Sequence, residues 1–139
     1  MTTTPPAHDD DVVSEETGLS PRNVAELKAA LLAERDSLVG KLREHVGAAI
    51  DGNAGLSDEM DLANRDQEQA YLLRLADKER KLVREVDDAL ARIAAGTYGV
   101  CEGTGEPIGL RRLQARPWAR YSIAYKEQIE RAKSDRVRD

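Results

Sequence analysis

Residues 63–95 contain neither proline nor glycine, and their apolar side chains recur every three or four positions. This spacing is typical of a coiled-coil seam, here interrupted by one glutamate. At 1.5 Å per residue, the helix would extend roughly 50 Å. Its apolar face is narrow, so it requires a partner helix rather than a broad core. The seam consists of Leu72, Leu75, Glu79, Leu82, Val86, Ala89 and Ile93.

A second apolar stripe precedes it and predicts the partner helix. Ser20 is a favourable N-cap, and Pro21 fits the first helical position, where its missing N–H is not needed. The stripe runs to about Ala49, and residues 51–55 then bring two glycines and turn-forming side chains. Two such helices joined by a short loop predict an antiparallel coiled-coil hairpin over residues 20–95, with its tip near 50–63. The stripe consists of Val24, Leu27, Leu31, Leu38, Leu42 and Val46.

The alternative is a compact helical bundle, but bundles need wider apolar faces than these seams provide. Apolar residues make up 40% of the chain and charged residues 34%, with four Tyr, one Trp and no Phe. This composition favours helix-on-helix packing over a large core. No run of 18 apolar residues exists, so we expect no membrane partner. A single Cys and no secretory signal predict a cytoplasmic protein.

Charge divides unevenly along the chain, whose net charge is −5. Residues 1–19 hold five acids and no base, which predicts a disordered acidic tail. Residues 20–110 hold 17 acids and 12 bases, whereas residues 111–139 hold four acids and nine bases. A protein that binds DNA directly is usually basic over its binding surface. We therefore expect no direct sequence-specific DNA binding.

Residues 96–139 have a different character and predict a small globular head with a C-terminal helix. Four glycines and two prolines between residues 97 and 117 indicate turns and a short β-hairpin. Apolar and aromatic residues from Trp118 to about Arg136 predict the closing helix. The fold class is therefore mostly α.

Two acids, Asp58 and Asp61, lie three residues apart at the predicted hairpin tip. Asp58 fits an N-cap, and the helix dipole favours Asp61 in the first turn. Alternatively, the tip presents both carboxylates to a partner's cavity. The spacing alone leaves both interpretations open.

The twenty residues from Tyr98 to Pro117, and above all Ile108–Pro117, resemble the zinc-finger region of the DksA/TraR family. Asp58–Ala63 also matches that family's tip pattern, Asp-x-x-Asp-x-Ala. The resemblance covers roughly residues 20–135. It implies a coiled-coil hairpin on a small zinc-finger-like head, in a bacterial regulator that binds RNA polymerase.

The metal ligands of this family do not match. The positions of its four zinc-binding cysteines hold Cys101, Thr104, Ser122 and Tyr125 here. Structural zinc needs four nitrogen or sulfur donors, so the finger is degenerate and we expect no zinc or other metal. Aromatic packing would replace the metal, through Tyr98, Trp118, Tyr121 and Tyr125.

Cys101 could be a redox sensor or an inert thiol. A sensor needs a low pKa and usually a second Cys, which this chain lacks. We expect Glu102 to raise the pKa of Cys101, which favours the inert thiol.

The resemblance further implies that the tip enters the secondary channel of RNA polymerase and alters the stability of initiation complexes. Asp58 and Asp61 would then lie near the catalytic Mg²⁺, with Ala63 as a close-packing contact. Family members also respond to ppGpp in the stringent response. The implied ppGpp contacts are Arg116 and Lys126, whereas a third expected base is Glu85 in this chain, which predicts a weaker response.

Two other functions fit parts of the sequence. A transcript-cleavage factor of the polymerase also carries tip acids on a coiled coil, but has a different domain at its base. A generic coiled-coil adaptor would leave the tip acids unused. No nucleophile elbow or phosphate loop is present, so we expect a binding protein and not an enzyme. We also expect a monomer.

Overall fold

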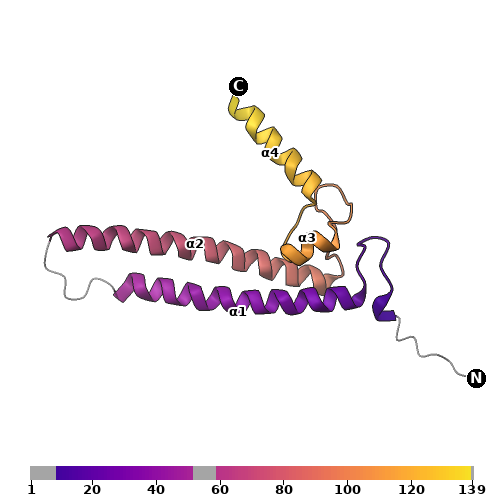
Figure 1. Cartoon of the computed structure of the whole chain (residues 1–139), viewed down its shortest axis with the longest axis horizontal. Coiled ribbons are helices and arrows are strands. Elements are labelled where there is room, and N and C mark those ends of the chain that lie inside the picture. The colour runs from indigo at the N-terminus through magenta and orange to yellow at the C-terminus, as the bar shows by residue number, and fades with distance from the viewer. Residues whose placement is uncertain (1–8, 52–58, 139) are drawn as a thin grey trace, which may run out of the picture. The chain divides into compact units, whose positions relative to one another are not determined.

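The computed structural model describes residues 9–51 and 59–138 (Figure 1). A short 3-10 helix, η1, spans Asp9–Asp11, and four α-helices follow: α1 (Pro21–Asp51), α2 (Glu59–Ala95), α3 (Leu110–Ala115) and α4 (Ile123–Arg138). Between the described residues the only β pairing is an isolated antiparallel bridge, Val100 to Pro107. The prediction of a mostly helical fold is confirmed. No helix in this part of the chain is long and apolar enough to cross a membrane.

The chain forms two compact units. One contains the described residues up to Leu32 together with those from Asp88 onward, and the other spans Ala33–Asp87. We call them the base unit and the hairpin unit. The base unit holds most of the buried apolar side chains, whereas the described residues of the hairpin unit contribute only Leu38, Ala49, Ala76 and Val86.

In the hairpin unit, α1 and α2 run antiparallel. Arg35 on α1 pairs with Asp87 on α2 at 2.6 Å, and His45 pairs with Glu79 at 2.7 Å. Arg35 precedes His45 on α1, whereas its partner Asp87 follows Glu79 on α2, so the two helices run in opposite directions. This confirms the predicted antiparallel hairpin. Glu79, the glutamate that interrupts the apolar seam, is thus partly buried against a His from the facing helix.

The helix ends follow the expected chemistry. The Ser20 hydroxyl accepts a hydrogen bond from the Asn23 N–H at 3.1 Å, and the Asn23 side chain accepts one from the Ser20 N–H at 2.9 Å. This reciprocal pair caps the N-terminus of α1. At the end of α2, Gly96 has φ 78°, and the N–H groups of Gly96 and Thr97 bind the carbonyls of Ile93 and Arg92. That is a Schellman motif, which requires the left-handed backbone that glycine allows.

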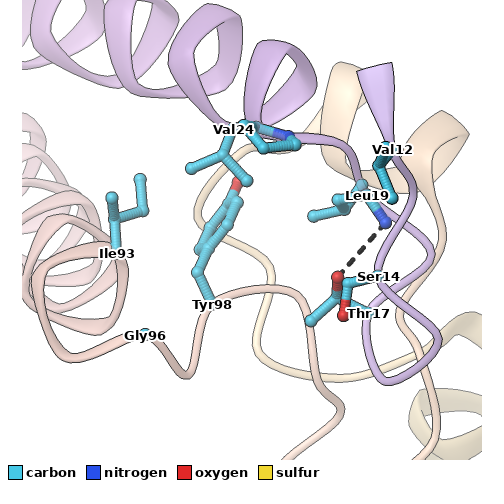
Figure 2. A pocket seen from close by; sticks show the side chains of 9 residues that line it. Val12, Ser14, Thr17, Leu19, Val24, Ile93, Gly96 and Tyr98 are labelled. Atoms are coloured by element: carbon cyan, nitrogen blue, oxygen red, sulfur yellow. Dashed lines mark hydrogen bonds between the residues drawn. The ribbon is translucent and has the colours of Figure 1, made fainter. Parts of the chain in front are cut away.

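Thr17 and Leu19, at the end of the predicted acidic tail, contact the turn after α2. Leu19 is buried, its N–H donates to the Thr17 hydroxyl, and a Cβ on Gly99 would lie 2.8 Å from the Leu19 side chain (Figure 2). The end of the segment thus packs onto the turn after α2, whereas residues 10–16 are exposed. Val12, Ser14, Thr17 and Leu19 line a cavity of about 570 Å³ with Val24, Ile93 and Tyr98. Residues 1–8 of the predicted tail lie outside the described residues.

The end of the chain differs from the predicted single helix that begins at Trp118. A six-residue helix, α3, precedes Pro117, and α4 begins only at Ile123. The Ser122 hydroxyl accepts the Tyr125 N–H at 3.2 Å and so caps α4. Residues 117–122 form the turn between these two helices.

We predict that Leu31→Ala destabilises the protein far more than Leu32→Ala does. Leu31 is 0% exposed, whereas its neighbour Leu32 is 46% exposed on the same helix. Loss of a fully buried leucine costs about 2–5 kcal/mol of unfolding free energy, and an exposed site changes it by about 0.5 kcal/mol or less. Urea unfolding followed by circular dichroism measures both variants. Equal losses of unfolding free energy in the two variants would contradict the burial of Leu31.

Candidate functional site

The tip acids predicted from the sequence fall at the start of α2. Asp61 lies in the first turn of this helix and is exposed, as is Ala63 two residues on. Asp61 forms no ion pair with any residue that the structure describes. Asp58 lies outside the described residues.

In the head, three of the four degenerate finger positions meet around one sulfur atom. Cys101 is buried, and the Thr104 hydroxyl and the backbone N–H groups of Gly103, Thr104 and Ser122 lie around its thiol, where they favour the thiolate. Burial raises the pKa of this thiol, but the hydrogen bonds outweigh burial and lower it to about 7. The neighbouring N–H and O–H groups thus stabilise the thiolate form of Cys101.

The expected direction of this pKa shift was wrong. We expected Glu102 to raise the pKa of Cys101, but the Glu102 carboxylate points into a group of cations. It lies 3.7 Å from Arg92 and 3.8 Å from Arg120, and Arg120 also pairs with Asp88. Its charge is balanced there, so the thiol responds to the nearby N–H groups instead.

Ser122 and Tyr125 also have other structural roles. Ser122 caps α4, and the Tyr125 ring packs on Gly103 so closely that a Cβ at this position would overlap the ring. Tyr125 also packs against Tyr121, with ring centroids 5.2 Å apart. The donor set of one thiol and three neutral hydroxyl side chains does not fit a structural zinc ion. Across the described ranges, no group of three or more His, Cys, Asp or Glu could hold a metal.

Tyr98 is the aromatic residue that holds the head together most directly. It is buried, and its hydroxyl donates to the Pro117 carbonyl at 2.7 Å. Burial raises its pKa to about 12. Arg112 adds a second link, since its Nε donates to the Tyr121 carbonyl at 3.2 Å. Trp118, also expected in this packing, is half-buried.

The two bases assigned to ppGpp lie together. Arg116 and Lys126 line one open cavity of about 300 Å³ between α3 and α4. Arg112, which the sequence did not single out, lines it too, with Ile123, Glu127 and Glu130. Three cations facing one cavity can bind a polyphosphate, although two glutamates on its rim oppose an anion. Glu85 is exposed on α2.

We predict that alkylation of Cys101 by iodoacetamide has a pH midpoint of about 7, below the value of about 8.5 for an unperturbed thiol. Removing the Thr104 hydroxyl with Thr104→Val should raise the midpoint, whereas Thr104→Ser should preserve it. Mass spectrometry of quenched samples follows the rate, which should be slow because Cys101 is only 1% exposed. A wild-type midpoint at the unperturbed value would contradict the hydrogen-bonded thiolate.

Known proteins are similar to this chain over both the two long helices and the head. Residues 23–93 match the model of the DnaK suppressor protein DksA N-terminal domain, and residues 96–124 match the prokaryotic dksA/traR C4-type zinc finger. The chain is 38% identical over 117 residues to the RNA polymerase-binding transcription factor DksA of Caulobacter vibrioides, covering 84% of this chain and 82% of that protein. It is 32% identical to the factor of the same name from Escherichia coli K12, covering 81% and 74%. The solved structure of transcription factor DksA2 from Pseudomonas aeruginosa superposes with a TM-score of 0.74 at 40% identity, covering 81% of this chain and 87% of that one. The chain belongs to the DksA family.

Proposed function

We propose that this protein is a transcription regulator that binds RNA polymerase directly and changes the stability of initiation complexes. Its relatives from Caulobacter vibrioides and Escherichia coli carry the name RNA polymerase-binding transcription factor. The match extends over most of both chains, so the hairpin and the head are compared together. In this proposal the hairpin tip enters the secondary channel of the polymerase, and the protein acts as a monomer without binding specific DNA sequences.

The observation that carries the proposal is the exposed carboxylate of Asp61 in the first turn of α2, which forms no ion pair with any residue of the ranges 9–51 and 59–138. Mg²⁺ prefers oxygen ligands, so a carboxylate brought near the polymerase active site can influence the metal or the basic groups around it. Asp58 and Ala63 would complete this contact. The protein changes the polymerase by binding and is not itself an enzyme.

We further propose that ppGpp is an effector in the stringent response and binds at Arg116 and Lys126. Both side chains line the same cavity, and Arg112 adds a third cation. The third base that the resemblance implies is Glu85 in this chain, and a carboxylate in place of a base removes an attraction to a polyanion. The response to ppGpp should therefore be weaker than in relatives with a base at this position.

Asp61→Asn should abolish most of the effect on promoter complexes while leaving affinity for polymerase nearly unchanged. Hydrogen bonds to charged groups contribute about 1.5–3 kcal/mol, which corresponds to roughly a 10- to 100-fold change. The measurement is the half-life of a ribosomal RNA promoter complex at saturating protein. Asp66→Asn is the control, because Asp66 is also an exposed acid of α2. Wild-type protein without effect would refute the regulator. Equal effects of wild type and Asp61→Asn would refute the tip assignment.

We also propose that the head folds without zinc. The protein denatured after purification in zinc-containing medium should release far less than one equivalent of Zn²⁺ to a zinc-sensitive dye, and chelator should not shift its thermal midpoint. The physical reason is that Cys101 is the one thiol of the chain, whereas structural zinc requires four donors. If the wild-type protein released one equivalent of Zn²⁺ and Cys101→Ser released none, the finger would still bind metal.

A further inference from the structure

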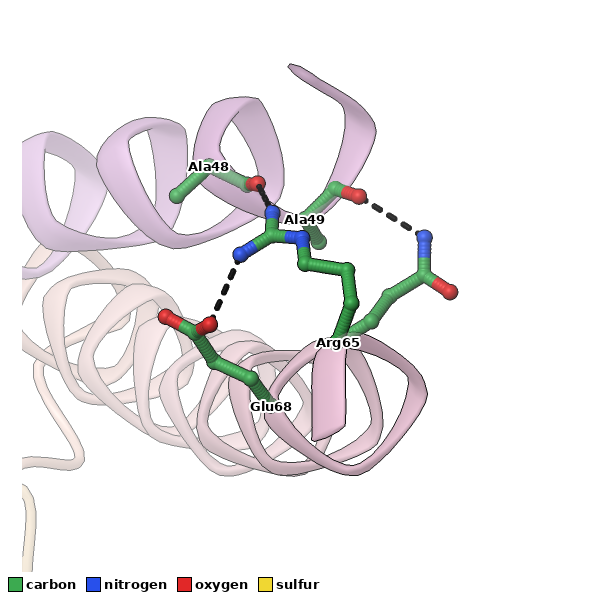
Figure 3. A network of polar contacts seen from close by, with 5 residues as sticks. Ala48, Ala49, Arg65 and Glu68 are labelled. Atoms are coloured by element: carbon green, nitrogen blue, oxygen red, sulfur yellow. Dashed lines mark hydrogen bonds and ion pairs between the residues drawn. The ribbon is translucent and has the colours of Figure 1, made fainter. Parts of the chain in front are cut away.

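Two side chains of α2 reach across the hairpin to the last turn of α1. Nη2 of Arg65 donates to the Ala48 carbonyl at 2.6 Å, and the Gln69 amide donates to the Ala49 carbonyl at 2.7 Å (Figure 3). The other terminal nitrogen of Arg65, Nη1, binds Glu68 at 2.8 Å. The Arg65 side chain is only 14% exposed, so its guanidinium lies between the two helices rather than in solvent.

The end of α1 needs these donors. The last four carbonyls of a helix have no partner within it, and the negative end of the helix dipole lies there. The last turn of α1 contains no basic residue, and its final residue is the acid Asp51. Arg65 and Gln69 therefore provide from α2 the capping groups that α1 itself lacks.

The same contact determines the surroundings of Asp61. Asp61 and Arg65 are four residues apart on α2, a spacing at which acid and base pair on a helix surface. The guanidinium instead turns to α1 and Glu68, which leaves Asp61 unpaired among the residues that the structure describes. These bonds form a clamp, made of Arg65 and Gln69, that joins the first turns of α2 to the end of α1. The clamp also engages Arg65, the first base along α2, which therefore does not pair with Asp61.

We propose that Arg65 is a positioning residue for Asp61: it fixes the start of α2 against the carbonyls of α1 and keeps the Asp61 carboxylate free for the polymerase. This role rests on the proposed function, although the clamp itself does not. Arg65 acts through Asp61 and needs no contact with polymerase.

The test compares Arg65→Gln and Arg65→Lys with Arg74→Gln, a control on the exposed surface of the same helix. Hydrogen exchange of the amides in residues 59–66, measured without polymerase, should accelerate about tenfold in Arg65→Gln but not in Arg74→Gln. Arg65→Lys keeps a cation opposite the α1 carbonyls and should restore most of the protection. Circular dichroism verifies that each variant is folded.

The second measurement uses polymerase. At saturating protein, Arg65→Gln should lose most of the shortening of promoter-complex half-life, while its affinity in a competition assay stays within about twofold of wild type, because Arg65 lies inside the hairpin. Arg65→Gln combined with Asp61→Asn should be no worse than Asp61→Asn alone, since both act through one carboxylate.

The possible outcomes distinguish the clamp, its link to Asp61 and the proposed function from one another. Unchanged exchange in Arg65→Gln would overturn the clamp, whatever the polymerase does. Independent, multiplying effects of Arg65→Gln and Asp61→Asn would overturn the link to Asp61. A wild-type protein without effect on promoter complexes would refute the proposed function, and the role of Arg65 with it, while faster exchange would still establish the clamp.

Discussion

The antiparallel pairing of α1 and α2 is the interaction on which the proposed tip depends. Two helices bury only a narrow seam, and most seam leucines of the hairpin unit remain half-exposed. Polar pairs across the helices add the specificity that such a seam lacks: Arg35 with Asp87, His45 with Glu79, and Arg65 with the Ala48 carbonyl. Apolar contacts tolerate sliding by one turn, whereas these directional bonds each specify a single register.

In the head, the residues at the four finger positions do not fit a structural zinc ion, and other contacts hold the glycine-rich turn. A zinc ion would join four donors from two segments at once. Here these segments are joined by the polar groups around the Cys101 thiol, by the Tyr98 hydroxyl on Pro117 and by the Tyr125 ring on Gly103. None of these contacts needs an external ligand. Stability of the head should therefore not depend on zinc supply, which distinguishes this chain from members of the family with four cysteines.

The sequence predicted those features that depend on local chemistry. Ser20, Pro21 and Gly96 mark helix ends because capping and left-handed backbone are properties of single residues and their neighbours. Contacts between distant segments were not predictable in this way. The docking of Leu19 on Gly99, the reach of Arg65 to α1 and the N–H groups around Cys101 all depend on the folded chain. The short helix α3 was not predicted because glycine and proline surround it, and the start of α4 was misplaced because Ser122 was interpreted only as a lost zinc ligand.

The same division applies to function. The motif Asp-x-x-Asp-x-Ala and the Ile108–Pro117 string are local and indicate the family by themselves, whereas the cavity shared by Arg112, Arg116 and Lys126 exists only in the folded chain. The measurement that tests the central claim most directly is a photocrosslink from the tip. Leu62 is adjacent to Asp61 and 39% exposed, so a benzophenone amino acid at this position can reach a bound partner. Our account predicts a crosslink to the polymerase subunit that holds the catalytic Mg²⁺, at residues lining the secondary channel. Crosslinks confined to other surfaces of the polymerase would contradict it.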